Sequence, residues 1–153
     1  LPRARAVAGS PLPAGGDQAL EIWTDGASRG NPGPSAIGML FRLPDGPDLC
    51  VHAEAIGQAT NNAAEYRAVL RALEFARGWG AQRIALYLDS ELIARQLAGI
   101  YRVKSPDLRP LHQQVLFLAR GLEEFRARHV PRERNQAADL LANQALDGEG
   151  GQD

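Results

Sequence analysis

Two acidic residues stand at the ends of apolar segments that have the composition of β-strands. Asp25 follows the apolar segment 20–24, and Asp89 ends the nearly continuous apolar segment 83–89. In open α/β sheets, reactive groups gather beyond the carboxyl ends of the strands. If these two strands are neighbours, the sequence predicts that both carboxylates lie side by side at one edge of the sheet.

Two further acids lie in segments with helical periodicity. Glu65 is placed at the edge of the apolar stripe of the first predicted helix. Asp139 lies in the last predicted helix, next to Leu140 and Leu141, which we expect to be core positions. Both acids therefore border surfaces that the fold should bury.

Four carboxylates that converge with little basic charge nearby repel one another, and they need either shared protons or hard divalent cations. Ligand sets of oxygen alone, without His or Cys, favour Mg²⁺ or Mn²⁺ over zinc. Each acid also has a simpler interpretation: Asp25 as a turn residue, Asp89 as a helix cap, and the two helix acids as solvated side chains. The joint pattern, two acids at strand ends and two on helices, favours a metal site.

The hydrophobic pattern predicts the elements that must position these acids, in the order β-β-β-α-β-α-α-β-α. Alternating or short apolar runs indicate strands, and apolar residues at helical spacing indicate helices. The predicted strands cover 20–24, 35–43, 49–56, 83–89 and 125–130, and the predicted helices cover 61–80, 90–99, 106–125 and 135–146. This order predicts an α/β fold with a mixed five-stranded sheet flanked by helices.

Composition and segment boundaries indicate one globular domain. The chain has 153 residues, is 44% hydrophobic and carries a formal net charge of −1. We expect a flexible tail or linker over 1–19, the domain over 20–146, and a flexible tail over 147–153. No apolar run approaches the roughly 18 residues of a membrane span, and no secretory signal is visible. We therefore expect a cytoplasmic monomer that does not bind membranes.

Several other kinds of site are excluded by the same residues. The loop after Asp25 has Ala27 and Arg29 where a calcium loop needs oxygen ligands, and no Gly-Lys-Ser/Thr follows it, so it is neither an EF-hand nor a P-loop. The single cysteine, Cys50, excludes an internal disulfide framework and a zinc site built from several cysteines.

Four sequence blocks together resemble the type 1 ribonuclease H family. They are TDGASRGNPGP at 24–34, TNNAAEY at 60–66, LDS at 88–90 and HVPRERNQAADLLAN at 129–143. The resemblance covers about residues 20–146, and it implies the ribonuclease H-like fold, which agrees with the order of elements above. It implies an endoribonuclease that hydrolyses the RNA strand of RNA/DNA hybrids and leaves 5′-phosphate and 3′-hydroxyl ends.

The resemblance also implies the roles of particular residues. The four carboxylates would hold two Mg²⁺ or Mn²⁺ ions in the substrate complex, and Glu65 would also contact a ribose 2′-hydroxyl, the group that distinguishes RNA from DNA. The matching substrate-binding residues are Ser28, Gly30 and Asn31 in the first block, and Thr60, Asn61 and Asn62 in the second. The second set could also be a helix cap, which is compatible with phosphate binding.

Two departures from the family pattern affect how the substrate would be held. Many bacterial members have a basic protrusion after the helix that follows Asp89, whereas here the segment 98–108 runs directly into the next helix. Fewer phosphate contacts should make binding weaker and less dependent on salt. Those members also carry a His in the loop before the last carboxylate. Here Arg132 is our preferred candidate for an assisting role, with Glu133 and His129 as alternatives.

Two other functions remain open at this stage. A groove without the protrusion could accept double-stranded RNA, which would make the protein a ribonuclease H-like nuclease of broader specificity. The domain could also be a nucleic-acid-binding module without catalysis, although the presence of all four acids counts against this.

Overall fold

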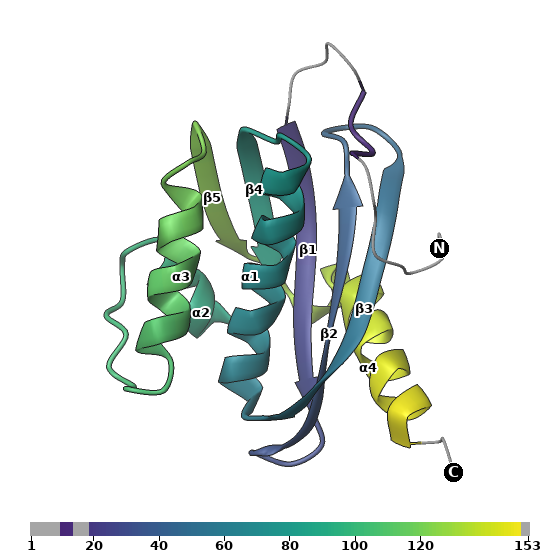
Figure 1. Ribbon diagram of the computed structural model, residues 1–153, viewed down its shortest axis with the longest axis vertical. Helices are drawn as coiled ribbons and strands as arrows, with labels where there is room; N and C mark the ends of the chain where they lie inside the picture. Colours follow the sequence, from purple (N-terminus) through teal and green to yellow (C-terminus); the bar gives the residue numbers. More distant parts are fainter. Residues whose placement is uncertain (1–9, 14–18, 151–153) are drawn as a thin grey trace.

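The computed structural model describes residues 10–13 and 19–150, so most of the predicted N-terminal tail lies outside the described residues. The described chain forms a mixed five-stranded sheet in the order β3-β2-β1-β4-β5 (Figure 1). Its strands are β1 (Ala19–Ser28), β2 (Gly33–Arg42), β3 (Asp48–Ala59), β4 (Arg83–Leu88) and β5 (Glu124–His129). β1, β2 and β3 pair antiparallel, whereas β4 is parallel to both β1 and β5.

Helices cover both faces of this sheet. They are α1 (Asn61–Gly78), α2 (Glu91–Leu97), α3 (Arg109–Ala119) and α4 (Gln136–Gly150), with a short 3-10 helix, η1 (Arg132–Arg134), before α4. α1 and α3 pack together on one face, and α4 crosses β1, β2 and β3 on the other (Figure 1). None of the helices in the described ranges is long and apolar enough to cross a membrane.

Side chains alternate between the two faces of the sheet along each strand, so the protein has one hydrophobic core on each face. Ile22 and Met39 point to the α1 face and are fully buried there, within the larger core. Leu40 and its neighbour Val51 point to the opposite face, where Leu141 of α4 covers them. Because strand side chains alternate between faces, Asp25 and Gly38 lie on the α4 side of the sheet.

The predicted α/β class, the order of the elements and the mixed five-stranded sheet are confirmed. Several boundaries differ. The long helix predicted over 106–125 is shorter, because residues 106–108 form a turn and Pro110 lies in the first turn of α3. The loop predicted at 131–134 contains η1, and α4 continues to Gly150. The expectation that Leu140 is a core residue is wrong, since its side chain is 49% exposed.

Asp25 lies inside β1 and does not end the strand as the apolar pattern indicated. The parallel pairing of β1 with β4 stops at Trp23 and Tyr87, but the antiparallel pairing of β1 with β2 continues to Ser28. Asp25 is therefore held by β2 on one side and is unpaired on the other. The opening that we expected at the end of β1 lies instead at the end of β4, where the pairing of β4 with β1 stops.

Two glycines allow the helices on both faces to approach the sheet beside Asp25. A Cβ atom on Gly26 would lie 2.4 Å from the carbonyl carbon of Ala64 in α1. A Cβ atom on Gly38, the cross-strand partner of Asp25, would lie 2.5 Å from the carbonyl oxygen of Ala138 in α4. Such contacts are closer than non-bonded atoms tolerate, so both helices pack directly on backbone.

The close packing of α1 on Gly26 leads to a prediction about stability. We expect Gly26→Ala to lower the free energy of unfolding by about 1–3 kcal/mol, because the added methyl group forces α1 away from β1. Gly78→Ala, near the end of the same helix, is the matched control: its Cβ would meet nothing within 4 Å. That change should be neutral or stabilising by up to about 1 kcal/mol. Urea unfolding of both variants measures the difference, and equal stabilities would contradict this packing.

Candidate active site

Three of the four predicted carboxylates meet in one cluster. One carboxylate oxygen from each of Asp25, Glu65 and Asp89 lies within 4.8 Å of the other two. Asp25 comes from β1, Glu65 from the second turn of α1, and Asp89 from the residue that follows β4. Asp25 and Glu65 are buried, at 5% and 8% exposure, and Asp89 is partly exposed. The cluster is therefore reachable from the side of Asp89.

Asp139 lies beside this cluster on the α4 side. Its carboxyl group is within hydrogen-bonding reach of Asp25, and its charge acts on both Asp25 and Glu65. Asn143, one turn further along α4, donates from Nδ2 to Asp139 Oδ1 at 3.2 Å. The structure thus brings together all four acids that the sequence singled out, three of them in mutual contact range and Asp139 next to Asp25.

Negative charge on the carboxyl groups of this cluster is energetically unfavourable. Burial, followed by the charges of Glu65, Asp89 and Asp139, raises the pKa of Asp25 well above its usual range. Burial also raises the pKa of Glu65, although the backbone N–H of Gly26 donates to Glu65 Oε1 at 2.7 Å and works in the opposite direction. In the absence of a cation, the cluster therefore keeps protons that free carboxylates would lose.

The donor set fits a divalent cation. Every ligand atom is a carboxylate oxygen, the hydrogen bonds to them come from neutral groups, and their mutual repulsion would be relieved by positive charge. Carboxylates within 4.8 Å of one another can share one ion as ligands. Hard cations such as Mg²⁺ and Mn²⁺ prefer such oxygen sites.

The predicted substrate-binding residues lie in two segments that hydrogen bonds hold together. Asn31 Oδ1 accepts from the backbone N–H of Asn61 at 2.9 Å, which ties the loop between β1 and β2 to the start of α1. Ser28 Oγ donates to the carbonyl oxygen of Ala59 at 3.0 Å. Thr60 caps α1, since its Oγ1 accepts from Ala63 N at 3.1 Å.

These contacts leave other polar groups of the two segments exposed. Gly30, with φ of 112°, stands at the exposed end of the loop between β1 and β2. Asn61 and Asn62 are exposed at the N-terminus of α1, where the first helical N–H groups favour anions. The two predicted segments are thus linked to each other, and Asn61 lies one helical turn before Glu65 on α1.

The segment that follows α2 forms a hollow beside Asn62. Its volume is about 510 Å³, and Gln96, Lys104 and Ser105 line it together with Asn62. Ile100 and Tyr101 stand at its rim and are 63% and 46% exposed. Within the described ranges no helix lies between α2 and α3, in agreement with the missing protrusion.

The three candidates for the assisting role are placed differently. Arg132, in η1, is exposed, and its positive charge acts on Glu65 in the direction that lowers the pKa of that carboxyl group. His129 is exposed at the end of β5, paired in register with Leu88. Glu133 lines a different hollow, described next.

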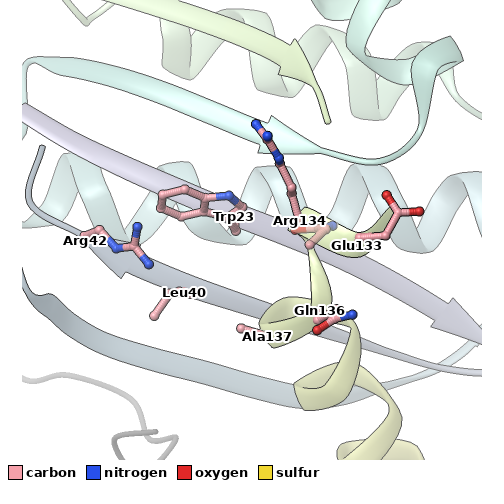
Figure 2. Close-up of a pocket in the computed structure, with 8 residues that line it drawn as sticks. Trp23, Leu40, Arg42, Glu133, Arg134, Gln136 and Ala137 are labelled. Atoms are coloured by element: carbon pink, nitrogen blue, oxygen red, sulfur yellow. The ribbon is translucent and has the colours of Figure 1, made fainter. Parts of the chain in front are cut away.

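A second hollow of about 380 Å³ lies behind the cluster, between η1, the start of α4 and the sheet (Figure 2). Trp23 and Arg42 line it from the sheet, with the Arg42 guanidinium 4.6 Å from the centre of the Trp23 ring. Glu133 and Arg134 line it from η1 (Figure 2). None of the four acids of the cluster is among the residues that line this hollow.

Sequence reasoning missed Asn135, which is 1% exposed and lies between η1 and α4. Its Nδ2 atom donates to the carbonyl oxygen of Thr24 at 2.9 Å and to Asp89 Oδ2 at 3.3 Å. The sequence does contain a signal for this residue: Asn135 is a polar residue at the start of a helix, one turn before the candidate ligand Asp139.

Comparison with known proteins agrees with this geometry. Residues 23–145 match the family described as reverse transcriptase-like. The chain is 46% identical over 128 residues to ribonuclease HI of Halobacterium salinarum, and 42% identical over 127 residues to the bifunctional protein Rv2228c of Mycobacterium tuberculosis. These alignments cover 84% and 82% of this chain, but they span 64% and 35% of the two relatives.

Solved structures show the same similarity in three dimensions. RNase H1 from Halobacterium salinarum NRC-1 superposes with a TM-score of 0.82 at 43% identity, covering 85% of this chain and 98% of that one. LC11-RNase H1 in complex with an RNA/DNA hybrid superposes with a TM-score of 0.81 at 38% identity, covering 85% and 98%. The fold is therefore the ribonuclease H-like fold. The chain belongs to the type 1 ribonuclease H family.

The raised pKa values lead to a prediction for the metal-free protein. A carboxyl group whose pKa is higher in the folded than in the unfolded state costs stability as the pH rises from the unfolded value, near 4, toward the folded value. In EDTA at pH 8 we expect Asp25→Asn to raise the free energy of unfolding by about 1–3 kcal/mol, with the gain disappearing near pH 4. Denaturant titrations at both pH values measure it.

Divalent metal provides the control for that experiment. If the cluster binds cations, Mg²⁺ or Mn²⁺ should raise the melting temperature of the wild-type protein and have little effect on Asp25→Asn. A stability gain at pH 8 that persists unchanged at pH 4 would show that Asp25→Asn acts through packing and would contradict the electrostatic explanation.

Proposed function

We propose that this protein is an endoribonuclease that hydrolyses the RNA strand of RNA/DNA hybrids and requires divalent metal. The observation that carries the proposal is the cluster of Asp25, Glu65 and Asp89 with Asp139 beside it, in a chain of the type 1 ribonuclease H family. The solved relative LC11-RNase H1, in complex with an RNA/DNA hybrid, supports the class of substrate.

The four carboxylates would hold Mg²⁺ or Mn²⁺, with two ions in the substrate complex. Bound ions would supply a water of lowered pKa for attack on the phosphate and would stabilise the charge of the departing 3′ oxygen. The protein's own part is to hold carboxylate oxygens from β1, α1, β4 and α4 at close range before substrate arrives. Asp25, on which the charges of Glu65, Asp89 and Asp139 all act, is the residue that would contact both ions.

Recognition of the RNA strand would come from the surface next to Glu65. Ser28, Gly30 and Asn31 lie in the loop between β1 and β2, which is tied to α1 through Asn61. Backbone and side-chain groups there can reach the shallow minor groove, where the 2′-hydroxyl groups of RNA are displayed. Glu65, which is buried and clustered with Asp25 and Asp89, would contact the 2′-hydroxyl next to the scissile phosphate.

The DNA strand would lie along the start of α1. Thr60 and Asn62 are placed at the helix N-terminus, where backbone N–H groups favour a phosphate. The adjacent hollow adds Lys104 and Ser105 to this surface. So few phosphate contacts fit the expectation that the substrate binds weakly and that its binding depends little on salt.

Catalysis by Asp25 is the direct test of the proposed function. We expect wild-type protein with Mg²⁺ or Mn²⁺ to cleave a labelled RNA/DNA hybrid, and Asp25→Asn to lower the rate by at least about 1,000-fold while its circular dichroism spectrum is unchanged. A double-stranded RNA of the same sequence is the comparison substrate. Equal cleavage of both duplexes would favour the broader nuclease, and no cleavage by wild-type protein at any metal concentration would favour a binding module.

Arg132 is proposed to assist near the scissile phosphate, because its charge already acts on Glu65. We expect Arg132→Ala to lower kcat by about 10–100-fold, the loss typical of one charge-stabilising donor in a site partly open to water. Arg134→Ala is the matched control, since Arg134 lies in the same 3-10 helix and lines the hollow behind the cluster.

The control variant should keep kcat within about twofold of wild type. Equal losses in Arg132→Ala and Arg134→Ala would indicate a general effect of positive charge on substrate attraction and would contradict a specific role for Arg132. The predictions of a monomer, of a cytoplasmic location and of flexible tails remain predictions from the sequence.

A further inference from the structure

Asn135 connects three elements that carry the acidic cluster, two through its side chain and one through its backbone. Its Nδ2 atom donates one hydrogen bond to the carbonyl oxygen of Thr24, the residue before Asp25, at 2.9 Å, and another to Asp89 Oδ2 at 3.3 Å. Its backbone carbonyl oxygen accepts from the N–H of Asp139 at 3.1 Å, in the first turn of α4. One buried residue therefore contacts β1, the end of β4 and α4 at the points where each supplies a carboxylate.

This use of the side chain differs from what the position would ordinarily favour. An Asn directly before a helix usually turns its Oδ1 atom to a free N–H group of the first turn and caps the helix. Here Oδ1 has no hydrogen-bond partner among the described residues, although it is buried. The amide has been turned away from its own helix and toward Thr24 and Asp89. Leaving a buried acceptor unpaired costs free energy, so the two contacts of Nδ2 must compensate for it.

The chemistry of the amide suits a site for cations. Nδ2 is a neutral donor, so it can fix the orientation of the Asp89 carboxylate without adding positive charge that would compete with a metal ion. The other supports of the cluster are also neutral: the N–H of Gly26 for Glu65, and Nδ2 of Asn143 for Asp139. Among these three supports, Asn135 is the one that joins carboxylate-bearing strands to α4.

We propose that Asn135 is a positioning residue for the divalent metal site: it sets the distance between Asp89, the Thr24–Asp25 segment and the start of α4. This proposal rests on the proposed function, since it assigns Asn135 a part in the same site. Partners that orient metal ligands commonly contribute about 10–100-fold to metal affinity or activity. Asn135 holds the ligands and does not contact the reacting atoms.

The test compares Asn135→Ala with Asn135→Leu, which has nearly the shape of the Asn side chain but neither its amide donor nor a charge. In both variants we expect the Mn²⁺ concentration that half-saturates the rise in melting temperature, without nucleic acid, to increase about 10-fold. We also expect kcat for hybrid cleavage to fall about 10-fold or more, with KM for the hybrid within about twofold. If Asn135→Ala does not fold, Asn135→Leu carries the comparison by itself.

Leu141→Ala is the control for a purely structural effect. Leu141 lies in α4, is 5% exposed and packs on Leu40 and Val51, and it makes no hydrogen bond to the carboxylates through its apolar side chain. It should lower the melting temperature but leave the Mn²⁺ midpoint and kcat at wild-type values.

The possible outcomes distinguish a failure of the positioning role of Asn135 from a failure of the proposed function. If the Asn135 variants lose thermal stability but keep the wild-type Mn²⁺ midpoint and kcat, Asn135 has only a structural role and this proposal is overturned. If wild-type protein itself neither responds to Mn²⁺ nor cleaves the hybrid, the proposed function fails, and the positioning role fails with it. A wild-type protein that cleaves while both variants match it refutes the positioning role alone.

Discussion

The rest of the structure depends on holding like charges together in a poorly solvated place. Asp25 and Glu65 are almost fully buried, and Asp89 and Asp139 add further negative charge beside them. Such a cluster opposes folding unless its members keep protons or gain a cation, so the surrounding packing must supply the difference. The fold does this by placing the acids on elements that the two hydrophobic cores already fix.

Close approach of helices to the sheet is what makes the distances short enough. Gly26 lets the backbone of α1 contact β1, and the N–H of the same glycine donates to Glu65. Gly38 lets α4 contact β2 directly opposite Asp25, which brings Asp139 within reach. Larger side chains at either position would move a helix, and with it one carboxylate, away from the cluster. The close packing at these two glycines therefore also sets the distances between the carboxylates.

The sequence predicts the topology and the four acids well, because hydrophobic periodicity and strand ends are local signals. It fails where tertiary contacts decide. Asp25 lies within β1 because β1 continues to pair with β2 beyond the point where its pairing with β4 stops. No local sequence pattern reveals this. Leu140 is exposed because the face of α4 that packs on the sheet carries Leu141, which contacts Leu40 and Val51. Asn135 reads as an ordinary helix start, and only the fold shows its amide turned toward Thr24 and Asp89.

The near-zero net charge of −1 acquires a different meaning once the acids are located. Four of the negative charges belong to a cluster that would be neutralised by cations in the working site, so they do not repel a phosphate backbone as exposed acids would. The surface beside them is built from hydroxyl, amide and backbone groups, with Lys104 at one hollow and Arg132 near Glu65. Binding then depends on shape and hydrogen bonds more than on bulk charge. Because the cations would also complete the proposed catalytic site, affinity for the proposed substrate and reactivity toward it should depend on the same ions.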